Sequence, residues 1–272
     1  MIKIYLLGGI GNQLFQTSLA VGLNQELDVQ IALDGKSLHN RSLGIDFLTL
    51  PEGLSISTGK AYSKTFHRFA SRGLLPNIYN EKELQKFFLN HQLRPYLTSA
   101  NLYGYFQSPY YFRNSENQVE KLFSNINMLS NVNPYIAIHI RGGDYLSYKK
   151  YYKLGVTYYV NAIKEAVQGS NMRIKVFTDD PFHANNIISE IKSKGIFKND
   201  FELVTAERDP WITFSGLINA EVLIIANSTF SWWAGWLAGR HGKKVIRPSS
   251  YYAGNNQPKN LYPAAWLEVD VV

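Results

Sequence analysis

The sequence predicts an α/β protein with parallel sheets arranged in two domains. Apolar, β-branched runs alternate with helical stretches of about ten to fifteen residues, which is the pattern of βαβ units. The chain of 272 residues is long enough for two domains. The stretch NVNPY, at 131–135, breaks regular structure and indicates a linker. We therefore predict one domain at residues 1–132 and a second at 133–272.

The first half opens with a strand, a turn and a helix. IKIYLL, at 2–7, predicts the strand, and the helix is expected from Leu14 to about Glu26. VQIALD, at 29–34, predicts a second strand. From there to about residue 130 the pattern is irregular, with aromatic residues clustered in NLYGYFQSPYYF and one helix indicated by NSENQVEKLFS.

The second half is more regular. Its expected strands and helices alternate along the chain in the order YIAIHI, YYVNAIKEAVQG, IKVFTDD, PFHANNIISEIKSKG, FELVT, PWITFSGLINA, EVLIIAN, STFSWWAGWLAG and KKVIRP. Pro181 begins one of these helices and Gly195 ends it, as is usual for the two residues. In a parallel sheet of this kind, ligands bind beyond the carboxyl ends of the strands.

Composition excludes several classes of site. The chain has no cysteine, so it forms no disulfide and no thiolate nucleophile. No Asp-x-Asp occurs, Glu268-x-Asp270 at an expected strand edge being a comparable spacing, and no histidine cluster has the spacing of metal ligands. We therefore expect no metal site. The N-terminal apolar run is too short for a signal peptide, and we expect no transmembrane span and a cytoplasmic location.

The net charge of +7 is concentrated in one segment. Residues 60–94 contain seven basic residues and only Glu81 and Glu83 as acids. Such a segment could meet nucleic acid, an anionic membrane or phosphorylated substrates, or could be an ordinary solvated face. Because no base-reading motif accompanies it, we expect no nucleic-acid partner. We do expect peripheral contact with an anionic membrane.

Polar residues gather where three strands of the second half end. HIRGGD follows the first strand, TDD the second and NSTFS the fourth. Arg141 offers a fork for phosphate oxygens, a helix that opens at Ser228 offers free N–H groups, and Asp179 or Asp180 could accept hydrogen bonds from sugar hydroxyls. Each feature also has a plain structural explanation: an ion pair with Asp144, a helix cap or, for His139, a buried core histidine. Their shared position at one sheet edge favours a binding site.

The glycine-rich stretch Gly8–Gln13 also lies between a strand and a helix. Its glycines would let backbone N–H groups approach an oxyanion. The spacing does not match a dinucleotide fingerprint, because position 14 is leucine, and no Gly-Lys-Ser/Thr of a Walker loop follows. Arginine, helix N-termini and backbone amides are therefore the groups available for neutralising a diphosphate.

Four motifs together resemble those of the α-1,2-fucosyltransferases, glycosyltransferase family eleven. The motifs are GGIGNQLFQ at 8–16, HIRGGDY at 139–145, VFTDD at 176–180 and ANSTFSWWAGWLA at 226–238. The resemblance implies a GT-B fold, with two Rossmann-like domains whose sheets face across a cleft. It also implies an inverting, metal-independent transfer of L-fucose from GDP-fucose to the 2-hydroxyl of a galactoside in a surface glycan such as an O-antigen. The acceptor would lie on the N-terminal domain and the donor on the C-terminal one.

The resemblance also implies roles for individual residues. Arg141 would hold the donor pyrophosphate, His139 would lie near the nucleotide and Asp144 would close the motif; these three are the catalytic candidates. The donor-binding candidates are Gly9, Gly11, Asn12, Gln13, Thr178, Asp179, Asn227, Ser228, Thr229 and Ser231. No general base is identified, and the sequence does not indicate an oligomeric state.

Two positions depart from the family pattern. The family usually has a second arginine where this chain has Gly142, and an acid that can bind guanine where this chain has Thr213, with Asp209 and Glu221 nearby. The alternatives are therefore a different donor such as GDP-colitose, an inactive homologue that binds sugar or nucleotide, or a nucleic-acid binder that uses the basic segment.

Overall fold

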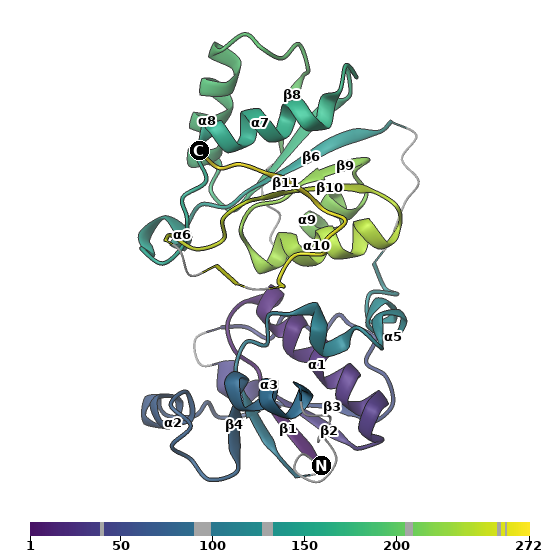
Figure 1. Ribbon diagram of the computed structural model, residues 1–272, viewed down its shortest axis with the longest axis vertical. Helices are drawn as coiled ribbons and strands as arrows, with labels where there is room; N and C mark the ends of the chain where they lie inside the picture. Colours follow the sequence, from purple (N-terminus) through teal and green to yellow (C-terminus); the bar gives the residue numbers. More distant parts are fainter. Residues whose placement is uncertain (39–40, 90–98, 127–132, 205–208, 255–256, 259) are drawn as a thin grey trace. The chain divides into compact units, whose positions relative to one another are not determined.

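The computed structural model describes residues 1–38, 41–89, 99–126, 133–204, 209–254, 257–258 and 260–272. These residues form two compact units, Met1–Asn125 and Ile126–Val272 (Figure 1). The domain boundary expected between 132 and 133 lies at the end of 127–132, a segment outside the described residues. Each unit contains one parallel sheet covered by helices. Within the described ranges, no helix is both long and apolar enough to cross a bilayer.

The N-terminal unit contains a five-stranded sheet with the strand order β3-β2-β1-β5-β4. The pairs β1–β2, β1–β5, β2–β3 and β4–β5 are all parallel. Its elements are β1 Ile2–Tyr5, α1 Ile10–Leu27, β2 Ile31–Asp34, η1 Gly35–Leu38, β3 Leu54–Ser57, α2 Lys64–Ala70, β4 Ile78–Asn80, α3 Glu81–Leu89, β5 Asn101–Tyr103, η2 Pro109–Phe112 and α5 Glu116–Lys121.

Three strands of this sheet correct the sequence-based expectation. The stretch that we expected to be irregular contributes β3, β4 and β5, of which β5 pairs directly with the central strand β1. These strands have only three or four residues, and β3 has no fully buried residue. A strand this short shows neither a long apolar run nor a clear alternation, so its pattern is weak. The predicted strands at 2–7 and 29–34 and the helix at 114–124 are present within shorter bounds.

The C-terminal unit contains a six-stranded parallel sheet with the order β11-β10-β9-β6-β7-β8. All nine elements of the predicted alternation are present, a short helix is added, and an edge strand lies at Glu268, where a strand edge was expected. The elements are β6 Tyr135–Ile140, α6 Asp144–Ser147, α7 Val156–Val167, β7 Arg173–Thr178, α8 Pro181–Ser193, β8 Phe201–Val204, α9 Pro210–Ile218, β9 Val222–Ile224, α10 Thr229–Arg240, β10 Lys244–Pro248 and β11 Leu267–Val269.

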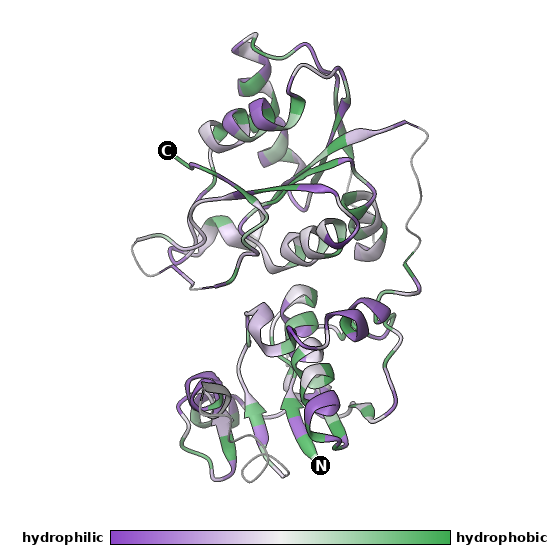
Figure 2. Cartoon of the chain, turned by 45° about the vertical axis from the view of Figure 1, so that its right-hand side comes forward, coloured by the Kyte–Doolittle hydropathy of each residue, from purple (hydrophilic) through white to green (hydrophobic). Residues whose placement is uncertain are grey.

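This strand order is that of a doubly wound sheet. From β6 the chain moves to β7 on one side, whereas from the neighbouring β9 it moves to β10 on the other side. Helices α7 and α8 cover one face and α9 and α10 cover the other (Figure 1). The apolar side chains of β6 that face α7 belong to the main core, which includes Ile136, Ile138 and Ile140. Figure 2 shows these strands as hydrophobic segments between the helices.

A tryptophan cluster fills the space around α10. Trp232 and Trp233 are fully buried and contact each other edge to face, with ring centroids 5.0 Å apart. Trp233 also contacts Trp236, and Trp232 contacts Trp266 from the C-terminal segment. All five tryptophans of the chain lie in the C-terminal unit. The long motif at 226–238 thus supplies much of the packing between α10 and its neighbours.

Candidate functional site

The candidate site lies at the edge of the C-terminal sheet where the strand order reverses. Strands β9, β6 and β7 are adjacent and parallel, so their carboxyl ends meet at this edge. The prediction that the three polar motifs follow neighbouring strand ends is therefore confirmed. Ligands of doubly wound sheets bind in the crevice outside such a reversal.

Arg141 is held at this edge by a carboxylate from the next strand. Its Nη1 lies 2.8 Å from Oδ2 of Asp179, just beyond the end of β7. The other oxygen, Oδ1, accepts the backbone N–H of Gly142 at 2.8 Å. Asp179 therefore fixes both the guanidinium and the backbone that follows it. The side chain of Arg141 is 26% exposed, so it is restrained without being sealed from a ligand.

Gly142 is packed tightly against the start of α8. A Cβ at this position would lie 2.4 Å from Cβ of Asp180 and 2.9 Å from its Oδ2. Asp180 caps α8 by accepting the N–H of His183 at 3.0 Å, and it also accepts the N–H of Gly143 at 3.3 Å. These backbone hydrogen bonds lower the pKa of Asp180 below its ordinary value. The family resemblance sets Gly142 against a usual arginine, and in this structure any side chain at position 142 would require Asp180 to shift.

His139 is a buried, neutral imidazole. It is 3% exposed, and its ring lies 6.0 Å from that of Phe230 at the start of α10. Burial, followed by the positive charge of Arg141, lowers the pKa of His139 to about 3. Its Nδ1 is buried with no hydrogen-bond partner among the described residues. At neutral pH this residue can serve as a neutral hydrogen-bonding group but carries no charge.

The first turn of α10 adjoins this histidine. Ser228 precedes the helix in an extended conformation, and its side chain makes no capping hydrogen bond. The first N–H groups of a helix have no partner within the helix, so anions are favoured at this position. Thr229 is the first helical residue and is partly exposed. Ser228 thus does not act as the plain side-chain cap that was the alternative explanation.

Three of the predicted binding residues instead hold the backbone in place. Ser231 is fully buried and donates to the carbonyl oxygens of Ala226 and Ser228. The amide nitrogen of Asn227 donates to two carbonyls, those of Tyr152 at 2.9 Å and Tyr251 at 2.8 Å. Thr178 is 2% exposed, and its hydroxyl is hydrogen-bonded to the backbone of Asp180. These three side chains therefore hold the backbone of the site in position through hydrogen bonds.

A tyrosine cluster that the sequence did not single out lies beside Arg141. The guanidinium carbon is 5.1 Å from the ring centroid of Tyr145, which stacks on Tyr151 at 4.0 Å. Burial raises the pKa of Tyr145 above its ordinary value. Tyr145 directly follows Asp144 in the motif HIRGGDY, and this position next to a catalytic candidate is the sequence feature that could have indicated its role. Asp144 itself begins α6, and its side chain lies outside the described residues.

In the N-terminal unit, Gly8–Gln13 lies between β1 and the body of α1, but α1 begins at Ile10, four residues before the expected Leu14, so Ile10–Gln13 form its first turn. Gly8 has φ +75°, a conformation that glycine adopts without strain, and Gly9 caps the helix without a side chain. Gln13 is fully buried: it donates to the carbonyls of Gly8 and Ser42 and accepts the N–H of Gly44. Asn12 accepts a hydrogen bond from Gln107, outside the predicted motif, at 2.7 Å. Gly9 is exposed and Gly11 is buried.

Two acids that were considered for guanine binding have other partners. Asp209 caps α9 by accepting the N–H of Trp211 at 2.9 Å. Glu221 precedes β9, at the opposite end of that strand from the candidate site, and pairs with Lys243 at 2.6 Å. Glu268 lies in the edge strand β11, as expected, and pairs with Arg247. Among the residues with described positions, no group of three or more His, Asp or Glu could hold a metal ion.

Comparison with known proteins identifies relatives along nearly the whole chain. The sequence model of glycosyl transferase family 11 matches residues 79–270. An α-1,2-colitosyltransferase from Escherichia coli is 25% identical, over 97% of each chain. The O-antigen biosynthesis glycosyltransferase WbnK, also from E. coli, is 27% identical over 97% of this chain and 99% of that protein.

Solved structures share the fold. NodZ α-1,6-fucosyltransferase co-crystallised with GDP matches with a TM-score of 0.52 and 14% identity, over 85% of this chain and 91% of that one. A family 9 glycosyl transferase from Veillonella parvula matches with a TM-score of 0.51 and 10% identity, over 99% and 85% of the two chains. The fold class expected from the sequence, GT-B, is thereby confirmed.

Proposed function

The chain belongs to glycosyltransferase family 11, and from this premise we propose that it moves L-fucose from GDP-fucose to the 2-hydroxyl of a galactoside. The acceptor in this proposal is part of a surface glycan such as an O-antigen, and the reaction takes place in the cytoplasm. The enzyme would thus be a galactoside α-1,2-fucosyltransferase. WbnK, a relative over nearly its full length, is named for O-antigen biosynthesis.

The pairing of Arg141 with Asp179 is the observation that carries the proposal. The ion pair restrains the guanidinium just beyond β6, where the strand order reverses. On one side of β6 lies β9, which leads to α10, and on the other lies β7, which leads to α8. Arginine binds two phosphate oxygens in a fixed fork. The first N–H groups of α10 and the neutral His139 would complete a site for a nucleoside diphosphate.

The proposed reaction inverts the anomeric centre and uses no metal. The acceptor oxygen attacks the anomeric carbon while the bond to the diphosphate breaks, so negative charge grows on the leaving group. Arg141 and the start of α10 would stabilise that charge directly. The acceptor hydroxyl must also lose a proton. Asp144 remains a catalytic candidate, but we assign it no role in this proton transfer. Gly9 and Gly11 remain donor-binding candidates through their backbone.

Colitosyl transfer is the second candidate. An α-1,2-colitosyltransferase is among the full-length relatives, which makes GDP-colitose a reasonable alternative donor. The same site would serve, because the diphosphate is common to both donors. The replacement of the second arginine by Gly142 changes the phosphate side of the site and leaves the choice of sugar open.

The test compares donors and two matched arginine variants. Binding of GDP, UDP, CDP and ADP is followed by thermal shift with EDTA or with Mg²⁺, because a ligand at about 100 times its Kd stabilises by about 2.7 kcal/mol. Transfer from GDP-fucose and GDP-colitose to a galactoside is then measured by chromatography of the product. Arg141→Ala should reduce kcat/KM by about 10²–10³-fold. Arg173→Ala, which breaks an exposed pair with Glu202 at the other end of β7, should not.

Each outcome has a defined meaning. A shift with GDP that is insensitive to EDTA, together with fucosyl transfer, supports the proposal. Transfer from GDP-colitose alone favours the second candidate. Binding of GDP without transfer from either donor, under conditions where WbnK is active, indicates an inactive homologue. Stabilisation by UDP or CDP in place of GDP overturns the proposed donor.

A further inference from the structure

A basic and apolar surface covers the outside of α2 in the N-terminal unit. Residues 53–80 contain no acidic residue, although they contain Lys60 and three further basic side chains. The α2 surface, as we define it, consists of the exposed side chains of Lys64, Arg68, Phe69, Arg72 and Leu74. Phe69 is 42% exposed and Leu74 is 59% exposed, so two large apolar side chains lie within this basic surface.

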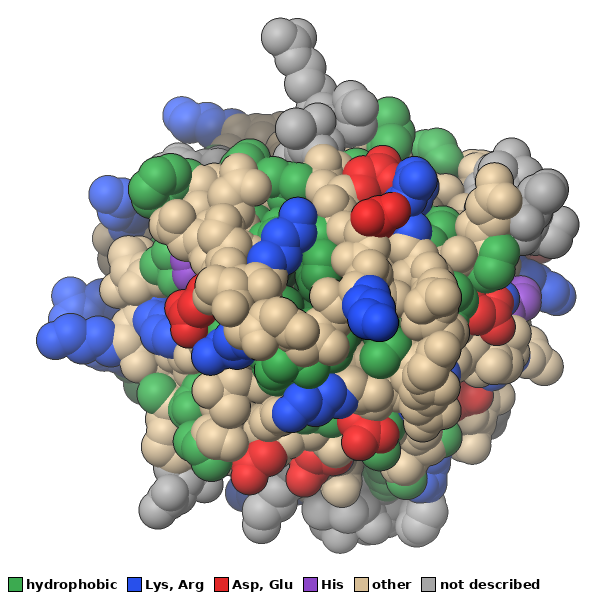
Figure 3. Space-filling model, turned by 90° about the horizontal axis from the view of Figure 1, so that it is seen from above, with side chains coloured by type: hydrophobic (Ala, Val, Ile, Leu, Met, Phe, Trp, Pro, Cys, Tyr) green, Lys and Arg blue, Asp and Glu red, His purple; other side chains and the backbone are tan. Residues whose placement is uncertain are grey.

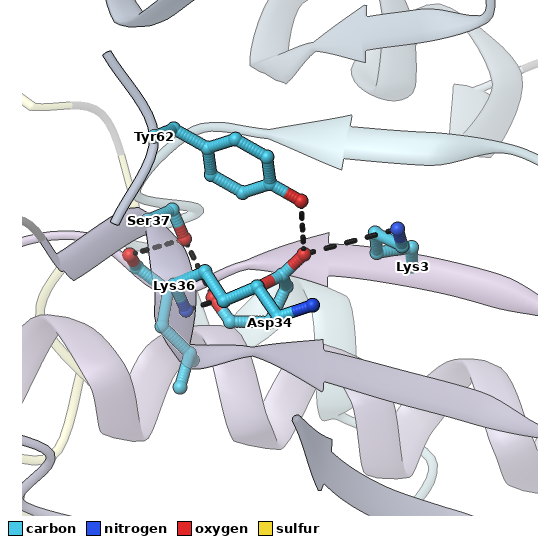
Figure 4. Close-up of polar contacts among 6 residues, drawn as sticks. Lys3, Asp34, Lys36, Ser37 and Tyr62 are labelled. Carbon is cyan, nitrogen blue, oxygen red and sulfur yellow. Dashed lines mark hydrogen bonds and ion pairs between the residues drawn. The ribbon is translucent and has the colours of Figure 1, made fainter. Parts of the chain in front are cut away.

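The inner face of α2 is fixed to the sheet, so its outer face is well defined. Tyr62, just before the helix, donates its hydroxyl hydrogen to the buried Asp34 at the end of β2, at 2.8 Å (Figure 4). Phe66 stacks on Tyr62 with ring centroids 4.4 Å apart, and Ala70 is fully buried. His67 forms a hydrogen bond with the hydroxyl of Tyr103 on β5, at 2.8 Å. These contacts leave the opposite side of the helix facing outward.

The end of α2 brings its two exposed apolar side chains together. The N–H of Leu74 donates to the carbonyl of Phe69 at 3.0 Å, and the N–H of Gly73 donates to that of Ala70 at 3.0 Å. Gly73 has φ +67°. This pair of bonds is the Schellman motif, in which the residue after the glycine packs near the residue that accepts its N–H. Phe69 and Leu74 therefore form one apolar tip at the end of the helix.

The basic side chains run beside this tip. Lys64 and Arg68 are four residues apart and lie on the same side of α2, and Arg72 follows in the turn that ends the helix. None of them forms an ion pair with a residue in the described ranges. The carboxylate of Glu83, near Gly73, accepts the N–H of Asn80 instead. On the face shown in Figure 3, by contrast, basic and acidic side chains are interspersed.

We propose that the α2 surface docks the protein on an anionic lipid bilayer. The basic row would face the phosphates of the headgroups, and Phe69 and Leu74 would enter the boundary with the acyl chains. Each basic residue near such a surface strengthens binding by about fivefold, equivalent to about 1 kcal/mol. Nucleic acid could pair with the basic side chains but would not bury Phe69 and Leu74. A lipid bilayer does both, so the combination favours lipid.

Vesicle binding tests the proposal without any sugar or nucleotide. The full chain is sedimented with vesicles of phosphatidylcholine alone or with about 30 mol% phosphatidylglycerol, at low and high salt. Binding is expected only to the anionic vesicles, and more weakly at high salt. Replacing Lys64, Arg68 and Arg72 together by serine should reduce the partition coefficient by about 100-fold. Replacing Phe69 and Leu74 by serine should reduce it by about tenfold or more, because apolar burial is lost.

A matched triple replacement provides the control. Lys192, Lys194 and Lys198 are converted to serine, which removes the same charge from the end of α8 and the loop after it. This variant should bind vesicles like the parent chain, and circular dichroism should show that all variants are folded. Equal losses in the two triple variants would indicate a general charge effect and overturn the proposal. So would binding that does not depend on Phe69 and Leu74, or equally tight binding of an RNA oligomer through the same residues.

The docking surface extends the proposed function but does not rest on its choice of donor. Transfer to a small soluble galactoside should be unchanged in the α2 variants, since no residue of the α2 surface belongs to the candidate donor site. Failure of vesicle binding with normal transfer would overturn docking alone. Failure of transfer with normal vesicle binding would count against the proposed function alone.

Discussion

Replacing Gly142 with alanine should destabilise the C-terminal unit through a single steric contact. The new Cβ would lie 2.4 Å from Cβ of Asp180, an atom whose position is set by the backbone at the start of α8. Overpacking of this kind costs about 1–3 kcal/mol. If Asp180 moves, its cap on α8 is also weakened, at about 1 kcal/mol. We expect a loss of about 2–4 kcal/mol, or roughly 5–15 °C in Tm for a unit of this size.

A double-mutant cycle isolates this contact. Asp180→Gly removes the obstructing Cβ, and because glycine is itself an acceptable cap, it should cost less than about 1 kcal/mol alone. The double variant with Gly142→Ala should then be almost as stable as Asp180→Gly alone, which gives a coupling of about 2–4 kcal/mol. Differential scanning calorimetry or urea unfolding measures each corner. Additive losses, or an unchanged Tm for Gly142→Ala, would refute the steric explanation for glycine at this position.

Three further changes probe the charges and hydrogen bonds of the two units. Asp179→Asn should lower stability by less than about 1 kcal/mol, because the pair with Arg141 is partly exposed. It should nevertheless reduce kcat/KM by about ten- to a hundredfold, because the guanidinium is no longer held in place. Steady-state kinetics together with urea unfolding would show whether the two effects separate. His139 has a folded pKa of about 3 against an ordinary value of 6.5, so the unfolded chain binds more protons between these values and stability falls as the pH falls. From pH 6.5 to 5 the loss from this residue should be about 2 kcal/mol, and a folded His139→Gln variant that keeps the same slope would contradict it. Tyr62→Phe should cost about 1–3 kcal/mol, because Asp34 loses a buried hydrogen bond; a urea midpoint equal to that of the parent would show that the bond contributes nothing.

The strand ends of the C-terminal unit were predictable because each is preceded by a long apolar run. YIAIHI is buried at all six positions, so its pattern was clear and the position of Arg141 just beyond it followed from the parallel topology. The ion-pair partner of Arg141 was harder to predict from the sequence. Sequence order alone could not decide between Asp144, three residues away, and Asp179, which the pairing of β6 with β7 brings close.

Other parts of the site could not be predicted because they depend on side-chain direction. Asn227 and Ser231 belong to a polar motif at a strand end, but their side chains turn inward to carbonyl oxygens. The sequence pattern gives the position of such residues and not the direction in which they point. The three short strands of the N-terminal unit were missed for a different reason: β3 is stabilised by pairing with β2, a long-range contact that leaves no periodic signal in four residues.

The location of every tryptophan in one unit gives the molecule two distinguishable optical signals. Tryptophan emission, excited selectively, reports only on the C-terminal unit, since the N-terminal unit contributes tyrosine and phenylalanine alone. Circular dichroism of the backbone reports on both units together. A denaturant titration followed by both signals therefore shows whether the two units unfold in one cooperative transition or separately. A substitution such as Gly142→Ala should then shift the emission curve, whereas Tyr62→Phe should shift mainly the remainder of the backbone signal.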